Sequence, residues 1–127
     1  MENHGCLFCE LSTGPHIIEN NFFYGKYDKY PVTDGHLLII PKRHTETLFD
    51  LTTEERSALF DLVEQAKNLL EDIYHPAGFN FGVNQGVAAG QTIPHLHLHI
   101  IPRYLGDIED PEGGVRGVIP EKQKYRK

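Results

Sequence analysis

Hydrophobic and polar residues alternate in one stretch late in the chain. Between Pro94 and Pro102 the sequence is His-Leu-His-Leu-His-Ile-Ile. Because successive side chains of a β-strand point to opposite faces, this alternation predicts a strand with its histidines on one face and most of its aliphatic residues on the other. The histidines are His95, His97 and His99. We expect the strand to span Thr92 to Arg103, with one face available for chemistry and the other packed in the core.

A second pattern predicts one long helix in the middle of the chain. Apolar residues recur at helical spacing from Leu59 to Ile73 and form a single stripe. Thr52-Thr53-Glu54-Glu55 is typical of a capping box at the start of a helix, and His75-Pro76 marks the end. We expect the helix to lie between these two signals.

Short extended segments rich in aromatic and aliphatic residues lie on either side of this helix. They are residues 17–18, 21–28, 36–41 and 79–84. A short helix or turn is expected near Cys6, before the Gly14-Pro15 break, and a glycine-rich loop is expected over residues 85–90. Strands grouped before and after one long helix indicate an α+β fold with an antiparallel sheet of about five strands.

Length and composition indicate one domain. The chain has 127 residues, 39% of them hydrophobic, which suits a single domain over 1–127 with its core at about 6–104. The extension at 105–127 is polar and contains glycine, and we expect it to be loop-like or to need a partner subunit for order. The net charge of −6 argues against general binding to nucleic acid or anionic membranes. No secretory signal or long apolar run is present, so we expect a cytoplasmic protein.

Three interpretations of the histidine face are open from the residues themselves. The histidines can be plain surface residues, they can hold a catalytic metal, or one of them can attack phosphorus as a nucleophile. A metal site would favour a nearby carboxylate, yet none lies between Asp72 and Asp107. The same interval instead offers neutral donors and permissive backbone suited to a phosphate. These residues are Asn84, Gly86, Gly90, Gln91 and Thr92.

Residues 95–101 resemble the His-φ-His-φ-His-φ-φ signature of the histidine triad (HIT) superfamily of nucleotide hydrolases and transferases. Three further stretches resemble parts of the same family. They are Cys6-Leu7-Phe8-Cys9, Gly35-His36 through Pro41-Lys42-Arg43-His44, and Gly90-Gln91-Thr92. Together they cover most of residues 6–104, and the resemblance implies the HIT fold, with one long helix and a short N-terminal helix.

The resemblance also implies a mechanism. His97 is expected to attack the α-phosphorus of a nucleotide and form a nucleotidyl-histidine that water then hydrolyses. An imidazole with an ordinary pKa of about 6.5 is largely neutral at pH 7, as this attack requires. His99 is expected to bind the phosphate and protonate the leaving group. His36 is expected to support the nucleophile from the adjacent strand, although it can equally be a structural histidine after a glycine turn.

Ligand contacts follow from the same resemblance. Asp28 matches a position that binds ribose hydroxyls, although it can also be a solvated turn residue. Four other residues match positions that hold the phosphates, and each can instead bond only to loop backbone. They are Asn84, Gly90, Gln91 and Thr92. Phe8 and Ile17 are candidates for the base pocket, with a plain core role as the alternative.

Cys6 and Cys9 are the two cysteines of the chain, and a Cys-x-x-Cys pair suits a metal or redox site. Two thiolates and two histidines would form a closed tetrahedral zinc site. A similar pattern in galactose-1-phosphate uridylyltransferases and some triad proteins implies His44 and His95 as the other ligands. The alternative is a reduced, metal-free pair. We expect a structural zinc ion and no organic cofactor.

The C-terminal part bears on the substrate. Arg103 and the stretch 113–120 resemble the fragile-histidine-triad-like branch, which implies a dinucleoside polyphosphate hydrolase that releases a nucleoside monophosphate. Three alternatives are open: an adenosine phosphoramidase, a dinucleoside polyphosphate phosphorylase, and a non-catalytic nucleotide-binding module. The resemblance further implies a homodimer in which two half-sheets join.

Overall fold

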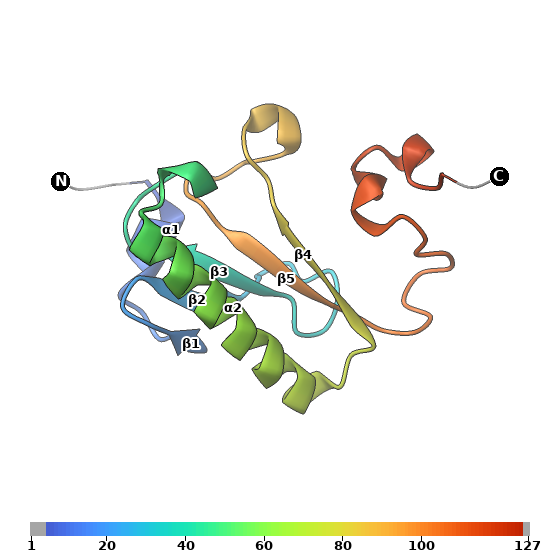
Figure 1. The fold of residues 1–127 in the computed structure, drawn as a ribbon, viewed down its shortest axis with the longest axis horizontal. Coiled ribbons are helices and arrows are strands. Elements are labelled where there is room, and N and C mark those ends of the chain that lie inside the picture. The colour runs from blue at the N-terminus through green and yellow to red at the C-terminus, as the bar shows by residue number, and fades with distance from the viewer. Residues whose placement is uncertain (1–4, 126–127) are drawn as a thin grey trace.

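The computed structural model describes residues 5–125, and its framework is one antiparallel sheet with a long helix across one face (Figure 1). The strands are β1 (Ile18–Glu19), β2 (Phe23–Tyr27), β3 (Leu37–Pro41), β4 (Gly78–Val83) and β5 (Leu98–Arg103). Their order in the sheet is β1-β2-β3-β5-β4, and each neighbouring pair is antiparallel. The helices are α1 (Leu7–Leu11) and α2 (Thr53–Tyr74). The predicted α+β class is confirmed.

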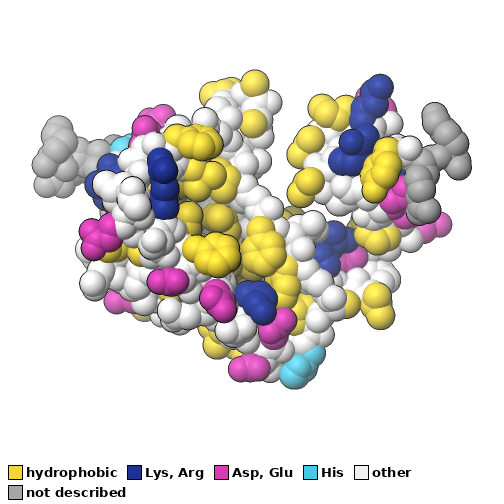
Figure 2. Space-filling view, in the orientation of Figure 1, with side chains coloured by type: hydrophobic (Ala, Val, Ile, Leu, Met, Phe, Trp, Pro, Cys, Tyr) yellow, Lys and Arg dark blue, Asp and Glu magenta, His cyan; other side chains and the backbone are white. Residues whose placement is uncertain are grey.

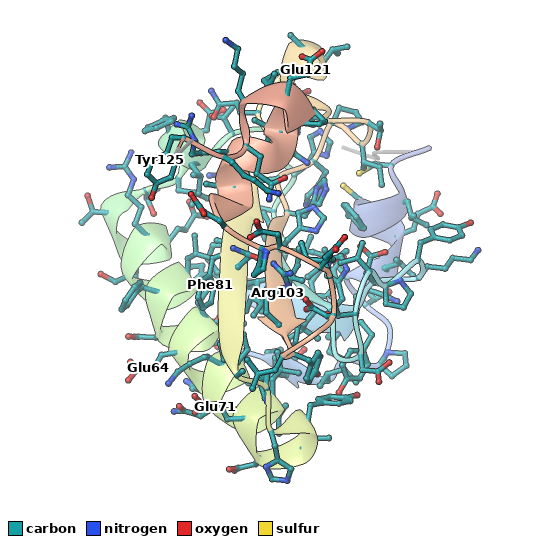
Figure 3. The ribbon with its side chains drawn as sticks, turned by 90° about the vertical axis from the view of Figure 1, so that its right-hand side faces the viewer. Glu64, Glu71, Phe81, Arg103, Glu121 and Tyr125 are labelled. Carbon is teal, nitrogen blue, oxygen red and sulfur yellow. The ribbon has the colours of Figure 1, made fainter. Side chains whose placement is uncertain are left out.

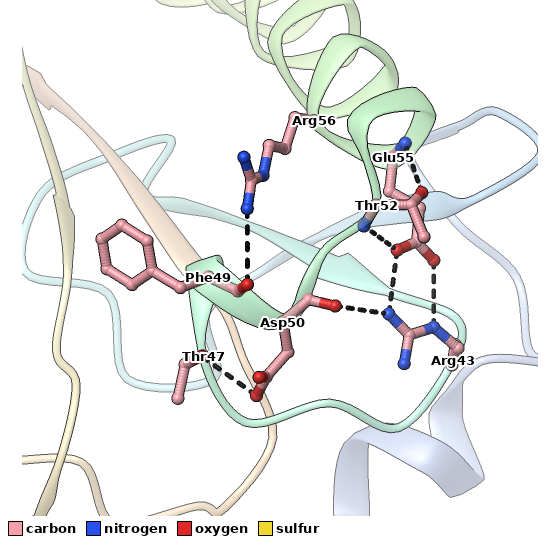
Figure 4. Close-up of polar contacts among 7 residues, drawn as sticks. All are labelled: Arg43, Thr47, Phe49, Asp50, Thr52, Glu55 and Arg56. Carbon is pink, nitrogen blue, oxygen red and sulfur yellow. Dashed lines mark hydrogen bonds and ion pairs between the residues drawn. The ribbon is translucent and has the colours of Figure 1, made fainter.

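The start of α2 is fixed by a network that also holds the loop after β3 (Figure 4). Thr52 and Glu55 form the predicted capping box, in which the Thr52 hydroxyl accepts from the Glu55 N–H and the Glu55 carboxylate accepts from the Thr52 N–H. Arg43 donates two further bonds to the same carboxylate, at 3.0 and 2.8 Å. The hydrogen bonds from Arg43 lower the pKa of Glu55 to about 2, so this carboxylate stays ionised and keeps the loop in place.

The sheet has a core on each face because residues alternate along its strands. One core lies between α2 and the sheet and includes Leu37 and Ile39 of β3 together with Leu62 and Leu70 of α2. The other core packs α1 against the opposite face. It comprises Cys6, Phe8, Tyr24, Leu38 and Ile40. This second face carries the histidines, since His99 pairs directly with Leu38 across β3 and β5.

The histidine strand is shorter than the sequence predicts. β5 begins at Leu98, so residues 92–97 lie outside the sheet. Pro94 has no N–H to give to a strand partner, and the Leu96 N–H donates to the Thr45 carbonyl in the loop after β3, at 2.7 Å. The predicted common face nevertheless holds, because the Phe8 ring packs against the rings of both His95 and His97. His95 and His97 are thus positioned by an irregular segment and only His99 by the sheet.

The segment after β5 stands beside the β4 edge of the sheet (Figures 1 and 3). Residues 106–125 contain 3-10 turns at Gly114–Val118 and Pro120–Lys122, in a segment that we expected to be loop-like. Arg116 donates to the carbonyls of Lys122 and Gln123 and gives the segment a fixed shape. Within residues 5–125, no helix is long and apolar enough to cross a membrane.

Candidate active site and metal centre

A cavity of about 510 Å³ opens on the α1 side of the sheet. Six residues predicted for nucleotide chemistry line it, although they come from four separate parts of the chain. They are Asp28, Asn84, Gly90, Thr92, His97 and His99. Apolar side chains from α1, β3 and the segment before β5 line it as well. These are Leu7, Phe8, Leu11, Leu38 and Ile93. The cavity therefore combines polar groups suited to phosphate and ribose with an apolar wall suited to a base.

The hydrogen bonds of His97 define which ring nitrogen carries its proton. His97 Nδ1 lies 2.9 Å from the main-chain carbonyl oxygen of His95. A carbonyl oxygen can only accept, so Nδ1 must hold the proton and donate. Nε2 of a neutral His97 is then left with its lone pair. The ring is nine-tenths buried and lines the cavity. Its orientation is fixed at Nδ1, and the lone pair on Nε2 is the atom that can act as a nucleophile.

A second chain of bonds gives His99 the opposite arrangement. The Val32 N–H donates to His36 Nδ1 at 3.1 Å, so a neutral His36 carries its proton on Nε2. His36 Nε2 lies 2.9 Å from His99 Nδ1 and donates to it. His99 Nδ1 is therefore the acceptor, and His99 carries its own proton on Nε2. Two adjacent rings thus present one lone pair and one N–H.

Burial keeps His99 neutral in the free protein. Desolvation, together with the neighbouring His97 and His36, lowers the pKa of His99 to about 4, despite the opposing charge of Asp28. Desolvation likewise lowers the pKa of His36, with Asp28 again opposing. His99 therefore meets a ligand as a neutral hydrogen-bond donor, and the negative charge of a bound phosphate would raise its pKa toward that of a proton donor.

This depressed pKa predicts how stability changes with pH. The unfolded chain binds a proton at His99 near pH 6.5, whereas the folded chain does so only near pH 4. Acidification between these values therefore favours the unfolded state, and the free energy of unfolding falls by about 1–2 kcal/mol from pH 7 to pH 5 on account of this one group. Urea denaturation at the two pH values should show a smaller fall for His99→Asn than for wild type. His75→Asn, at an exposed histidine in the left-handed region, is the matched control and should keep the wild-type fall.

Asp28 lies beside the His36–His99 pair. Its Oδ1 accepts from the Tyr30 N–H at 2.9 Å, and its Oδ2 lies 3.4 Å from His36 Nε2. The sequence left two roles open for Asp28, a ribose contact and a turn residue. The carboxylate accepts a hydrogen bond within a turn and also lines the cavity. Tyr27, the residue before it, lines the cavity too and was missed by the sequence analysis.

Two predicted ligand contacts are not seen in the cavity wall. Gln91 uses its side chain to hold the glycine-rich loop: its oxygen accepts from the Gly86 N–H at 2.8 Å and its amide donates to the Glu46 carbonyl at 3.2 Å. Ile17 is 44% exposed and does not line this cavity. Phe8 does line the cavity, because α1 folds over the histidine face.

The four predicted zinc ligands lie close together in the structure, and one of them, His95, is two residues before His97. Each thiol sulfur lies close to both imidazole Nδ1 atoms: Cys6 Sγ is 3.5 Å from His44 and 3.2 Å from His95, and Cys9 Sγ is 3.1 Å and 3.4 Å from the same atoms. All four atoms lie within 4.8 Å of one another. Zinc bonds of about 2.0–2.3 Å place tetrahedral ligand atoms roughly 3.5 Å apart. The donor set and its spacing therefore fit a tetrahedral zinc ion.

The outer contacts of His95 support the same fit. His95 is fully buried, and its Nε2 lies 2.8 Å from the carbonyl oxygen of Pro41 at the end of β3. The proton must therefore sit on Nε2, which leaves the Nδ1 lone pair directed at the two sulfurs. A metal-binding imidazole commonly donates its other nitrogen to a carbonyl in this way.

Comparisons with known proteins give matches over most of this chain. A family model described as the HIT domain matches residues 13–106. The chain is 41% identical over 80 residues to the asymmetrical bis(5'-nucleosyl)-tetraphosphatase of Schizosaccharomyces pombe. The aligned region covers 63% of this chain and 44% of that protein. It is 35% identical over 92 residues to the AP-4-A phosphorylase of Mycobacterium tuberculosis, and this aligned region covers 72% of this chain and 47% of that protein. The chain thus spans less than half the length of these two relatives.

A solved structure bears on the metal centre. The crystal structure of a Zn-bound histidine triad family protein from Mycobacterium smegmatis superposes with a TM-score of 0.73, at 37% identity, over 81% of this chain and 78% of that one. The matched HIT domain begins at residue 13, so Cys6 and Cys9 lie before it.

Proposed function

This chain belongs to the HIT domain family, and on that basis we propose that it hydrolyses dinucleoside polyphosphates through a nucleotidyl-histidine at His97 and releases a nucleoside monophosphate. The observation that carries the proposal is the complementary protonation of two neighbouring rings. His97 is held with Nε2 free and His99 with Nε2 protonated, and both line one cavity. The names of the tetraphosphatase and phosphorylase relatives support the substrate class.

The proposed reaction has two displacements at the α-phosphorus. In the first, the Nε2 lone pair of His97 forms an N–P bond while the bond from phosphorus to the bridging oxygen breaks. The charge of the bound phosphates lets His99 take up a second proton from solvent before this step. The leaving oxygen takes the electron pair and receives the Nε2 proton of this imidazolium, which leaves His99 neutral. In the second, a water oxygen attacks phosphorus, the N–P bond breaks, and His99 regains a proton from the water. The His95 carbonyl stabilises the positive charge that develops on the His97 ring during the first step.

The surrounding residues have distinct proposed roles. Asp28 accepts hydrogen bonds from ribose hydroxyls, while Asn84, Gly90 and Thr92 contact the phosphates, since all four line the cavity. Gly90 has a φ of 98°, so the backbone at this position can approach a ligand without a side chain in the way. Gln91 supports the loop that carries these contacts.

One assay separates the candidate reactions. The protein is incubated with diadenosine tetraphosphate, with and without inorganic phosphate, and in parallel with an adenosine phosphoramidate. Our proposal predicts preferred cleavage of the tetraphosphate, with AMP as a product whether or not phosphate is present. ADP formed only with phosphate would indicate a phosphorylase, and strong preference for the phosphoramidate would indicate a phosphoramidase. Binding of nucleotide with no turnover of any substrate would contradict an enzymatic function.

We also propose that Cys6, Cys9, His44 and His95 hold a structural zinc ion, which supplies a fixed tetrahedral crosslink and no step of the reaction. Protein purified without chelator should contain close to one zinc per chain by elemental analysis. A Cys6→Ser, Cys9→Ser variant should lose it, because serine hydroxyls are poor zinc ligands. Wild-type protein without zinc, or an unchanged zinc content in the variant, would refute this site.

A homodimer in which the α2 and β4 surfaces of two copies meet is the third part of the proposal. Hydrophobic side chains gather over α2 and β4 (Figure 2), and they line a groove of about 570 Å³ that includes Phe60 and Phe81. These rings are 70% and 44% exposed, and Phe81 projects from β4 (Figure 3). A second copy docked on this groove would remove both exposed rings from water.

Sedimentation velocity tests this dimer. Wild type at micromolar concentration should sediment as a dimer, and Phe81→Asp should sediment as a monomer because it places a charge in the covered groove. Ile73→Asp, on an exposed α2 residue outside the groove, is the matched control and should remain dimeric. A monomeric wild type would overturn the proposed assembly.

A further inference from the structure

The proposed nucleophile lies on backbone that the sheet does not hold. His97 precedes the first residue of β5, and both strands that flank β5 begin their pairing with it at Leu98. The segment 92–97 has few main-chain bonds of its own: the His95 N–H bonds locally to Ile93, and the Leu96 N–H bonds to Thr45. Another device must therefore fix the position of His97.

The side chain of His95 provides that device. It is fully buried and attached at both ring nitrogens, with Nε2 on the Pro41 carbonyl and Nδ1 beside the sulfurs of Cys6 and Cys9. The carbonyl oxygen of this same residue accepts the His97 Nδ1–H at 2.9 Å. Anchoring the His95 ring therefore also places the group that orients His97.

The four-residue metal set is where three segments of the chain meet. Cys6 and Cys9 belong to the region of α1, His44 to the loop after β3, and His95 to the segment before β5. The loop that carries His44 also carries the Thr45 carbonyl that holds Leu96. α1 has only five residues, which is too short to be stable alone, and its Phe8 ring packs 5.0 Å from the His97 ring.

We propose that the Cys6, Cys9, His44 and His95 set is a positioning site for the nucleophile, because it fixes the His95 carbonyl that holds His97 with its proton on Nδ1 and its lone pair on Nε2. This inference rests on the proposed role of His97 and goes beyond a purely structural metal. Without the set, the His95–Leu96 peptide keeps its bond to the Thr45 carbonyl, but the loop that carries Thr45 and the His95 ring both lose their link to Cys6 and Cys9. The His95 carbonyl can then shift, and the His97 ring can adopt the other tautomer, whose Nε2 carries a proton and cannot attack.

The kinetic test uses His44, which lies on a different segment from His97. His44→Asn should remove the metal and lower kcat for diadenosine tetraphosphate by about 10–100-fold, a loss typical of disturbed outer-shell contacts, with KM within about threefold of wild type. His44→Cys should restore metal and most of kcat, because Cys₃His is an established zinc set. Leu70→Ala, a substitution in the core on the α2 side of the sheet, should lower the thermal midpoint and keep kcat.

A second readout needs no substrate and no activity. Long-range ¹H–¹⁵N correlation spectra report which ring nitrogen of each histidine is protonated, and a His97→Asn spectrum assigns the His97 signals. Wild type and His44→Cys should show His97 protonated on Nδ1, whereas His44→Asn should show the Nε2-protonated form in a mixture or in majority. Should His44→Asn fail to fold, Cys9→Ser, which keeps three of the four ligands, carries the same expectation.

The outcomes separate this inference from the proposed function. A metal-free variant with an unchanged His97 tautomer and unchanged kcat would overturn the positioning role. Equal losses of kcat in His44→Asn and Leu70→Ala would also overturn it, because general destabilisation would then account for the effect. A wild-type protein that cleaves no nucleotide would refute the proposed function alone, while the spectra would still decide whether the metal set controls His97.

Discussion

Replacing His97 with asparagine is expected to lower kcat for diadenosine tetraphosphate by roughly 10⁴–10⁶-fold, the scale seen when a covalent nucleophile is removed. Asparagine is smaller than histidine, and its amide can still donate to the His95 carbonyl that holds His97 Nδ1. The loss therefore reports the missing Nε2 lone pair rather than a collapsed site. Steady-state assays with product separation measure the change.

Nucleotide binding provides the control for this prediction. AMP affinity, measured by calorimetry, should stay within about fivefold of wild type, because the apolar wall and Asp28 are untouched. Turnover by His97→Asn above about one per cent of wild type, in protein free of contaminating enzyme, would exclude the covalent route.

The second large effect is expected at His99. His99→Asn removes the only ring N–H that the His36 relay directs toward the cavity, and kcat should fall by about 10²–10⁴-fold, as for loss of a general acid. The size of the loss should depend on the leaving group. A 4-nitrophenyl ester of a nucleoside monophosphate has a leaving group that needs no proton, so His99→Asn should cleave it nearly as well as wild type does.

A comparison of the two substrates gives this prediction its specificity. His97→Asn should be inactive on both, whereas His99→Asn should be impaired mainly on the polyphosphate. If His99→Asn lost the same factor on both substrates, His99 would serve only to bind or shape the site. Its assignment as proton donor would then be wrong.

Much of the fold follows from short-range patterns in the sequence. The stripe from Leu59 to Ile73 and the capping box at Thr52 predicted α2, and the structure places the helix at Thr53–Tyr74. The alternation around His97 predicted one histidine face correctly, because side chains alternate even on irregular extended backbone. Local periodicity predicts these two elements because each pattern reflects the burial of one face of a helix or strand in a core.

The same pattern did not reveal where β5 begins. Alternation continues through residues 95–98, but pairing depends on whether a neighbouring backbone is within reach. The Thr45 carbonyl, which lies in a loop far away in the sequence, takes the Leu96 N–H that a strand partner would otherwise receive. Pro94, which has no N–H to donate, is a local reason for a later start, but nothing near Leu96 in the sequence identifies Thr45 as its partner.

In the candidate site, too, the sequence predicts some features and not others. Residue types identified the rings, but main-chain atoms decide their roles: Val32 N–H fixes His36, the His95 carbonyl orients His97, and the Pro41 carbonyl orients His95. Every residue except proline carries the same N–H and C=O groups, so a sequence gives no sign of which ones point into a site. Gln91 shows the converse, because a side chain suited to phosphate binding bonds to its own loop and to Glu46 instead.

The central claim is that His97 carries the nucleotide covalently. The most direct test mixes wild-type protein with diadenosine tetraphosphate, quenches the reaction within milliseconds at alkaline pH, where a phosphorus–nitrogen bond to imidazole survives, and maps modified peptides by mass spectrometry. We predict one adenylyl group, attached at His97 and absent from the same peptide of His97→Asn. Turnover with no adduct at any quench time, or an adduct on a different residue, would contradict the claim.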